Sequence, residues 1–254
     1  MLRRILLGAM LLAAVTAARA VDYTDIWYLP SESGWGVNVV QSDNFLFMTF
    51  FVYGSDGRPT WYAAQVTKDA SGNFNGTLYS ATGTYFALPW AGNVISVAGT
   101  ASFQPTSPYT AKLIYTVNGV ATVTKIIQRQ TLTLITLGGA YAGVAIVDES
   151  GCAMAGRTIS DVDVTVTQQV NNSGPISIVL NYLASGTSCT FSGSVIQWGK
   201  LYQIPSATYS CSNGFKSTAM IDELNATPHG LEMLWRAPAT QGCTESGTFS
   251  GPLE

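Results

Sequence analysis

The sequence predicts an all-β protein made of two small antiparallel domains, each closing as an up-and-down barrel or a sandwich. Stretches rich in β-branched and aromatic residues recur at intervals of about 8–12 residues, and turn residues separate them. No segment shows the apolar periodicity of a long amphipathic helix. Charged residues make up 11% of the 254 positions, against about 25% in an average soluble domain. Uncharged polar side chains such as Thr and Ser, which suit the outer face of antiparallel strands, must therefore supply most of the polar surface.

The expected strands of the first half follow one another with short turns between them. The segment 54–59 is a turn because Asp56 and Gly57 tolerate a left-handed backbone and Pro59 fixes φ where the chain re-enters a strand. Asn118-Gly119 is typical of a two-residue type I′ hairpin turn. The strands are expected over residues 36–41, 45–53, 60–67, 74–80, 94–103, 110–117 and 120–134.

The second half shows the same pattern, with strands expected over residues 140–147, 162–170, 176–184, 190–198, 201–210, 216–224, 231–236 and 248–253. Leu137-Gly138-Gly139 is the expected boundary between the halves. Four of the six tryptophans precede it and all four cysteines follow it. We therefore expect an aromatic-rich domain over residues 21–137 and a disulfide-containing domain over residues 138–254. One continuous β structure is the alternative.

The first twenty residues have the features of a signal peptide. Arg3 and Arg4 precede an uncharged run over residues 5–18, and Ala18-Arg19-Ala20 provides small residues for cleavage. A transmembrane anchor is the alternative, but the run is shorter than the roughly 20 residues that span a bilayer. Removing three arginines would leave 9 basic and 15 acidic residues, a net charge of −6. We expect a periplasmic or secreted protein that does not span the membrane after cleavage.

Composition also argues against two classes of protein. Disorder requires few aromatic residues and many charges, whereas this chain has 6 Trp, 12 Tyr and 10 Phe. Nucleic-acid binding requires a basic footprint, whereas the pI is about 5.1. We therefore expect no nucleic-acid partner.

The four cysteines predict two disulfides in an oxidising compartment. Three connectivities are possible. The pairing Cys189–Cys211 is favoured because the intervening segment is expected to form two strands around Gly199-Lys200, and this leaves Cys152 with Cys243. A zinc site is disfavoured because there is no Cys-x-x-Cys and only one histidine. We expect no metal and no other cofactor.

Catalytic patterns are weak, and we assign no catalytic residue. His229 lies in an expected turn and faces solvent, and neither Gly-x-Ser-x-Gly nor His-Glu-x-x-His occurs. Asp148-Glu149 is expected in a turn. Glu32 with Asp56 is the pair we would test for the facing carboxylates of a glycosidase. A hydrolase is the least favoured function.

The most specific motif is Glu32-Ser33-Gly34-Trp35-Gly36, followed by Phe51-Val52-Tyr53 and by Asp56-Gly57-Arg58-Pro59-Thr60-Trp61. Residues 25–66 resemble a module common in exported proteins of proteobacteria. The second half, with Cys-Thr-Phe-Ser-Gly, Tyr-Ser-Cys and a late Gly-Cys, resembles the cysteine-containing region often found with it. The resemblance implies export and a β architecture, and it implies no reaction.

We expect a non-catalytic binding protein that uses an aromatic-lined groove or barrel mouth for a glycan or a small amphipathic ligand. One alternative is that Trp35 and Trp61 pack a small core while Glu32, Asp56 and Arg58 hold the turns in place. Glu32 and Arg58 both lie next to turns and are expected to pair across the sheet end. Another alternative is a structural or protein-interaction protein of the cell envelope. The candidate ligand-binding residues are Trp27, Tyr28, Glu32, Trp35, Asp56, Arg58, Trp61, Tyr62 and Trp90.

Overall fold

The computed structural model describes residues 21–151, 155–168, 173–227, 229–240 and 242–254. The expected signal peptide, residues 1–20, lies outside them. The fold prediction is confirmed: two antiparallel sheets of eight strands each close into barrels, and within each barrel consecutive strands pair with one another. Among the described residues the helical content is one short 3-10 turn, Pro30–Glu32, and no helix there has the length and hydrophobicity needed to cross a membrane.

The first barrel, barrel 1, is closed by pairing of its first strand with its last. Its strands are β1 (Asp25–Tyr28), β2 (Gly36–Ser42), β3 (Phe45–Tyr53), β4 (Pro59–Lys68), β5 (Phe74–Gly83), β6 (Asn93–Pro105), β7 (Thr110–Val117) and β8 (Val123–Arg129).

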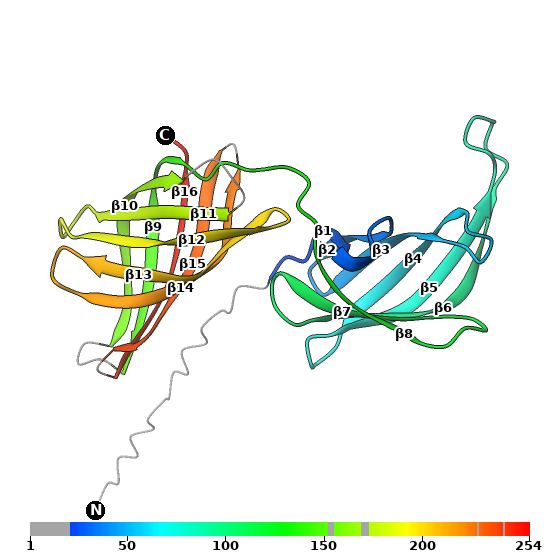
Figure 1. Ribbon diagram of the computed structural model, residues 1–254, viewed down its shortest axis with the longest axis horizontal. Helices are drawn as coiled ribbons and strands as arrows, with labels where there is room; N and C mark the ends of the chain where they lie inside the picture. Colours follow the sequence, from blue (N-terminus) through cyan, green and yellow to red (C-terminus); the bar gives the residue numbers. More distant parts are fainter. Residues whose placement is uncertain (1–20, 152–154, 169–172, 228, 241) are drawn as a thin grey trace, which may run out of the picture.

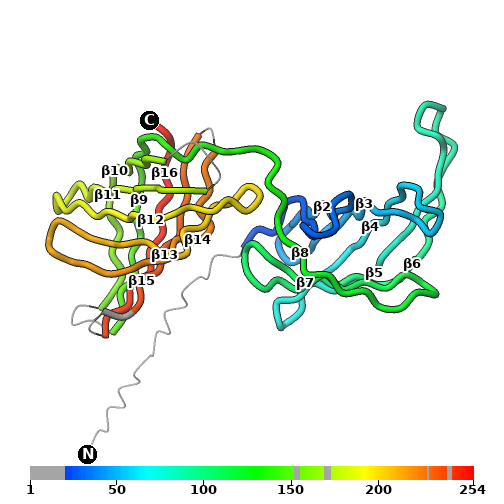
Figure 2. Tube along the Cα trace, in the orientation of Figure 1, coloured from blue at the N-terminus to red at the C-terminus, as the bar shows by residue number. Residues whose placement is uncertain are grey.

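The second barrel, barrel 2, is closed in the same way by pairing of β16 with β9. Its strands are β9 (Gly139–Ser150), β10 (Gly156–Gln168), β11 (Ser173–Tyr182), β12 (Ser188–Trp198), β13 (Leu201–Cys211), β14 (Lys216–Thr227), β15 (Gly230–Thr240) and β16 (Cys243–Pro252). The boundary expected at residues 137/138 lies in the segment that joins β8 to β9 (Figure 2).

Each barrel has its own apolar interior because alternate residues of a strand face inward. In β3 the inward residues Leu46, Met48 and Phe50 are buried. In barrel 2 the buried residues Ile176, Ile178 and Leu180 show the same alternation along β11. Burial of such side chains contributes about 25 cal/mol per Å² of apolar area. The period-two pattern in the sequence therefore accounts for both cores.

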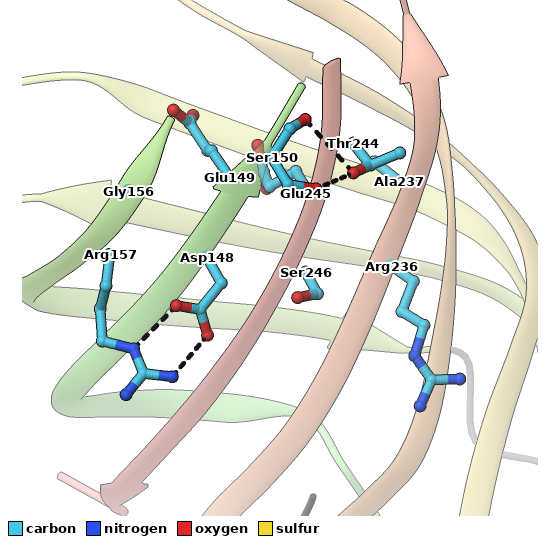
Figure 3. Close-up of a pocket in the computed structure, with 10 residues that line it drawn as sticks. All are labelled: Asp148, Glu149, Ser150, Gly156, Arg157, Arg236, Ala237, Thr244, Glu245 and Ser246. Carbon is cyan, nitrogen blue, oxygen red and sulfur yellow. Dashed lines mark hydrogen bonds and ion pairs between the residues drawn. The ribbon is translucent and has the colours of Figure 1, made fainter. Parts of the chain in front are cut away.

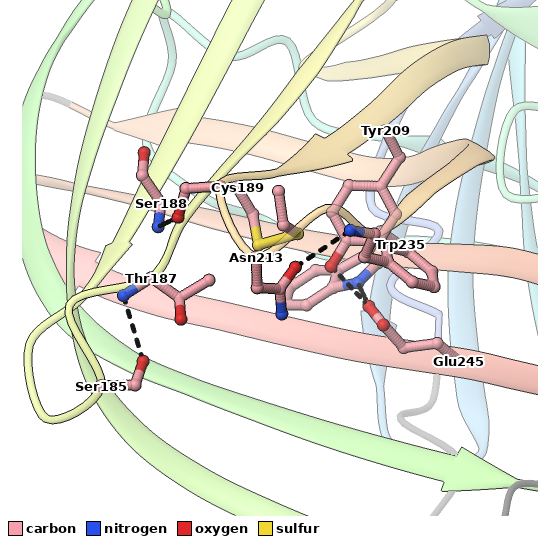
Figure 4. The surroundings of a disulfide bond; sticks show 11 residues. Ser185, Thr187, Ser188, Cys189, Tyr209, Asn213, Trp235 and Glu245 are labelled. Atoms are coloured by element: carbon pink, nitrogen blue, oxygen red, sulfur yellow. Dashed lines mark hydrogen bonds between the residues drawn. A yellow bond between two sulfur atoms is a disulfide. The ribbon is translucent and has the colours of Figure 1, made fainter.

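One disulfide joins neighbouring strands of barrel 2. Cys189 in β12 and Cys211 in β13 are directly opposite in the register and are bonded (Figure 4). The predicted pairing is confirmed, and the two strands meet at the Gly199-Lys200 turn, where Gly199 has a φ of +61°. The expected partnership of Cys152 with Cys243 involves Cys152, which lies outside the described residues, so that pairing remains a prediction.

The two barrels contact each other through polar groups. Tyr109, in the loop before β7, reaches barrel 2, where its hydroxyl accepts from the Glu223 amide (2.8 Å) and donates to Asp222 Oδ1 (3.2 Å). Its ring stacks on Trp198. From the other side, Lys200 Nζ donates to Asp22 Oδ2 at 2.6 Å. The barrels are therefore held together by side chains from both of them.

Candidate functional site

The Glu-Ser-Gly-Trp-Gly motif lies at one end of barrel 1. Glu32 ends the short 3-10 turn, and its carboxylate accepts from Trp35 Nε1 at 3.1 Å. Lys125 Nζ of β8 donates to both Glu32 oxygens at 2.7 Å. These hydrogen bonds from Lys125 hold the pKa of Glu32 below its usual value. Trp35 packs against the barrel core. These contacts therefore attach the segment between β1 and β2, which contains Glu32 and Trp35, to β8.

This arrangement differs from the pairing expected for Glu32. Arg58 lies beside Asp56 instead, with its amide donating to Asp56 Oδ1 at 3.0 Å and its guanidinium 3.8 Å from Oδ2. Both side chains belong to the β3–β4 turn. The pairing of Glu32 with Arg58 was wrong because Lys125, on a strand far along the chain, is nearer to the motif. Glu32 and Asp56, the carboxylates suggested for a glycosidase, thus have different ionic partners.

Trp27 belongs to the interior of barrel 1. It is fully buried, its Nε1 donates to the Tyr23 carbonyl at 3.0 Å, and the guanidinium of Arg129 lies 5.0 Å from its ring. Arg129 is itself buried and pairs with Asp25 Oδ2 at 3.0 Å. Tyr28 and Tyr62 are half-buried, and Tyr62 packs against the same core. Trp27 therefore offers no surface to a ligand.

Of the remaining candidate aromatic residues, Trp61 and Trp90 are exposed, and Trp61 lies beside exposed residues that were not among the candidates. Phe51 and Trp61 are direct cross-strand partners on the outside of β3 and β4, with 57% and 49% of their surfaces exposed. Tyr53 lies beside Pro59 on the same side. Two strands further, Ile95 and Val97 of β6 also face outward, opposite Ala81 and Tyr79. We call Phe51, Tyr53, Trp61, Ile95 and Val97 the apolar face of barrel 1.

A second exposed cluster continues from this face. β5 and β6 are joined by a loop that carries Tyr85, Phe86, Leu88 and Trp90, which we call the hairpin tip. Their exposed fractions are 62%, 91%, 61% and 72%. Figure 1 shows this hairpin extending away from the rest of barrel 1. Contiguous exposed apolar patches on soluble proteins typically mark an interaction site.

Barrel 2 has a different kind of site, an open cleft of about 650 Å³ at the ends of β9, β15 and β16 (Figure 3). On its outer rim, the guanidinium of Arg157 donates twice to Asp148, at 2.7 and 2.9 Å. Asp148 and Glu149 were expected in a turn, but β9 continues through both of them to Ser150. The turn prediction was wrong because pairing with β10 and β16 extends the strand beyond its apolar part.

Glu245 is a partly buried carboxylate at the inner side of this cleft. Trp235 Nε1 and the Tyr209 hydroxyl both donate to its Oε1, at 2.7 and 2.9 Å (Figure 4). Burial raises the pKa of Glu245, and nearby Glu149 raises it further. Glu149 is the direct cross-strand partner of Glu245. Only closure of the barrel brings these glutamates together, so no local pattern in the sequence could have revealed the pair.

No protein-family model and no curated protein matches this chain. The fold and the exposed side chains define a class: a double eight-stranded β-barrel with an extended apolar surface on its first barrel.

Proposed function

We propose that the protein is a non-catalytic binding protein that holds an amphipathic ligand against the apolar face of barrel 1. The observation that carries this proposal is the side-by-side exposure of Phe51 and Trp61 on neighbouring strands, with Ile95 and Val97 on the same side of the sheet. Aromatic rings give large apolar contact areas at low conformational cost. The face is therefore suited to sugar rings or short alkyl chains.

Polar groups beside the face support an amphipathic ligand over a purely apolar one. Arg58 and Asp56 lie in the turn that joins β3 to β4, next to Tyr53 and Pro59, and their side chains are 86% and 63% exposed. Their charged groups can donate to and accept from hydroxyl groups of a ligand that covers the rings. The proposed ligand class is thus a glycan or a small molecule with a sugar-like head and an apolar body.

The proposal places the protein outside the cytoplasm, in the periplasm or secreted. The Cys189–Cys211 disulfide is compatible with an oxidising compartment. The signal-peptide pattern of residues 1–20 and the resemblance of residues 25–66 to an exported proteobacterial module support the same location.

Titration with monomeric octyl glucoside and with soluble oligosaccharides tests the proposal. In a Trp90→Phe background, which removes the more exposed tryptophan of the hairpin tip, binding should change the tryptophan emission, because Trp61 is half exposed whereas Trp27 and Trp235 are fully buried. By calorimetry, the double variant Phe51→Ser, Trp61→Ser should bind at least about tenfold more weakly, a loss of about 1.4 kcal/mol.

The matched control is Val144→Ser, Ile159→Ser, which removes two exposed apolar side chains from barrel 2 and should bind like the wild type. A flat response to every compound, or equal affinities for all three proteins, would show that the apolar face is not a ligand site.

A further inference from the structure

We propose that the hairpin tip of barrel 1 inserts into the surface of a lipid bilayer. This inference goes beyond the proposed function. Its side chains are those of the hairpin tip, namely Tyr85, Phe86, Leu88 and Trp90, and Ile95 of the apolar face lies in the strand that leads to the tip.

The register of the strands makes the tip accessible to a flat surface. Pairing of β4 with β5 ends at Ala63 and Tyr79, and pairing of β6 with β7 ends at Gly99 and Val117. In contrast, β5 and β6 stay paired with each other as far as Gly83 and Asn93. Residues 80–96 therefore form a two-stranded ribbon that pairs with no third strand of the described residues, and it carries the tip away from the barrel (Figure 1).

The ribbon exposes a large apolar side chain on each of its two sides. Val94 and Ile95 are adjacent in β6 and so face opposite sides of the ribbon, yet their exposed fractions are 65% and 63%. At the tip, Phe86 is 91% exposed. A groove in a partner protein would cover one side of a ribbon, whereas a bilayer surrounds whatever enters it. Exposure on both sides thus favours the bilayer as the occupant.

Charge is absent from the whole region. No Asp, Glu, Lys or Arg occurs between Asp69 and Lys112, so neither ribbon strand nor the tip would carry a charge into the bilayer. Trp and Tyr are the residues enriched at the level of lipid headgroups, where one end of the side chain is apolar and the other is hydrated. The tip provides both types beside Phe and Leu.

The loop also satisfies part of its backbone internally. The Thr84 amide donates to the Gly92 carbonyl (3.1 Å), the Ala91 amide to Thr84 Oγ1 (2.9 Å) and the Leu88 amide to the Tyr85 carbonyl (2.9 Å). Groups that are already bonded need not be stripped of water on insertion, which lowers the cost of entering the interface.

Flotation of residues 21–254, which lack the apolar segment expected to be the signal peptide, with phosphatidylcholine vesicles tests the inference. The wild type should float with the vesicles, whereas Phe86→Asp, Trp90→Asp should lose most of the bound fraction. The control Ile159→Asp, Leu183→Asp places the same two charges at exposed apolar residues of barrel 2 and should float like the wild type. Phosphatidylcholine with doxyl-labelled chains should quench Trp90, and Trp90→Phe should still float while losing that quenching.

The charge of the chain predicts the lipid and salt dependence. Without residues 1–20 the chain has 9 basic and 15 acidic residues and a net charge of −6, so anionic lipids should not strengthen binding and salt should not abolish it. Binding that requires phosphatidylglycerol, or that persists unchanged in Phe86→Asp, Trp90→Asp, would overturn the inference.

Two further outcomes separate this inference from the proposed function. Binding of octyl glucoside without any binding to vesicles would overturn the bilayer inference and leave the apolar face intact as a ligand site. If sedimentation instead shows a wild-type dimer that the tip variants make monomeric, the occupant is a second copy of the chain and the bilayer inference is wrong.

Discussion

In barrel 2, the pKa of Glu245 is determined by the groups that surround its carboxylate. Its carboxylate receives hydrogen bonds from Tyr209 and Trp235, which favour the charged form, but burial and the neighbouring Glu149 favour the neutral form and raise its pKa above the usual value of 4.5. Removal of a carboxylate from water disfavours the charged state more than two hydrogen bonds compensate for here.

The raised pKa of Glu245 predicts a pH dependence of stability. The folded state binds this proton more tightly than the unfolded state does, so the stability that Glu245 contributes is fully present below pH 4.5 and falls as the pH rises through the folded-state pKa. Glu245→Gln keeps an acceptor oxygen for Tyr209 and Trp235 and removes the titration. The free energy of unfolding of the variant, relative to that of the wild type, should therefore increase between about pH 4 and about pH 7.

Denaturant unfolding at several pH values, followed by tryptophan fluorescence, measures this difference. Glu254→Gln is the control, since it removes a carboxylate at the exposed C-terminal residue. A pH-independent difference between Glu245→Gln and the wild type would contradict the argued role of burial.

At the scale of elements, the β12–β13 hairpin is cross-linked by a disulfide. Cys189 and Cys211 are direct cross-strand partners and lie 22 residues apart in the sequence. A cross-link over a loop of this length stabilises the fold mainly by restricting the unfolded chain, by about 3 kcal/mol. Cys189→Ala, Cys211→Ala should lower the free energy of unfolding of barrel 2 by about that amount.

The adjacent cross-strand pair offers a matched control. Thr190 and Ser210 are direct partners in the same two strands, and Thr190→Ala, Ser210→Ala should cost less than about 1 kcal/mol because no covalent constraint is lost. Substitution is preferred to reductant, because a reductant would also act on any bond made by the other cysteines. Equal losses in both double variants would show that the disulfide adds nothing beyond strand pairing.

Much of the element order could be predicted from the sequence. Residues 45–53 and 110–117 were expected as strands and are β3 and β7 with the same bounds, because alternation and flanking turn residues are local signals. The turn at Asn118-Gly119 was predicted less well. Five residues separate β7 from β8, and only Gly119 of the two has a positive φ. Local propensity indicated a turn, but the register of the barrel sets the length of the connection.

The candidate site could be predicted only in part. The exposure of Phe51 and Trp61 depends on which face of a strand turns outward, and the run 45–53 is apolar on both faces, so the sequence does not distinguish them. The strands expected from the sequence ended at residue 80 and resumed at residue 94. The two-stranded ribbon that carries the hairpin tip away from the barrel was therefore not predicted. The signal that could have revealed it is the absence of charge between Asp69 and Lys112.

At the scale of the whole molecule, a small set of polar contacts couples the barrels. The Tyr109 hydroxyl bonds to the Glu223 amide and to Asp222, which is 8% exposed, and burial raises the pKa of Tyr109, so the hydroxyl stays protonated as a donor. The Lys200 amide donates to Asp25 Oδ2 at 3.2 Å, and Asp25 also pairs with buried Arg129. The same carboxylate thus organises the interior of barrel 1 and its contact with barrel 2.

These contacts predict that the barrels lose their fixed arrangement when Tyr109 and Lys200 are both replaced. In the double variant Tyr109→Ala, Lys200→Ala, the loss of Tyr109 leaves the Glu223 amide and the Asp222 carboxylate without their partner from barrel 1, at a cost of about 1–3 kcal/mol. The loss of Lys200 removes the ion pair with Asp22. Neither barrel core is touched, so both barrels should remain folded. We expect a larger radius of gyration by small-angle X-ray scattering and separate unfolding transitions for the two barrels. Tyr53→Ala, Lys68→Ala, which removes the same residue types from exposed positions of barrel 1, should leave the radius unchanged; an unchanged radius in the first variant as well would show that the linker and the remaining Lys200 amide contact with Asp25 set the arrangement of the barrels.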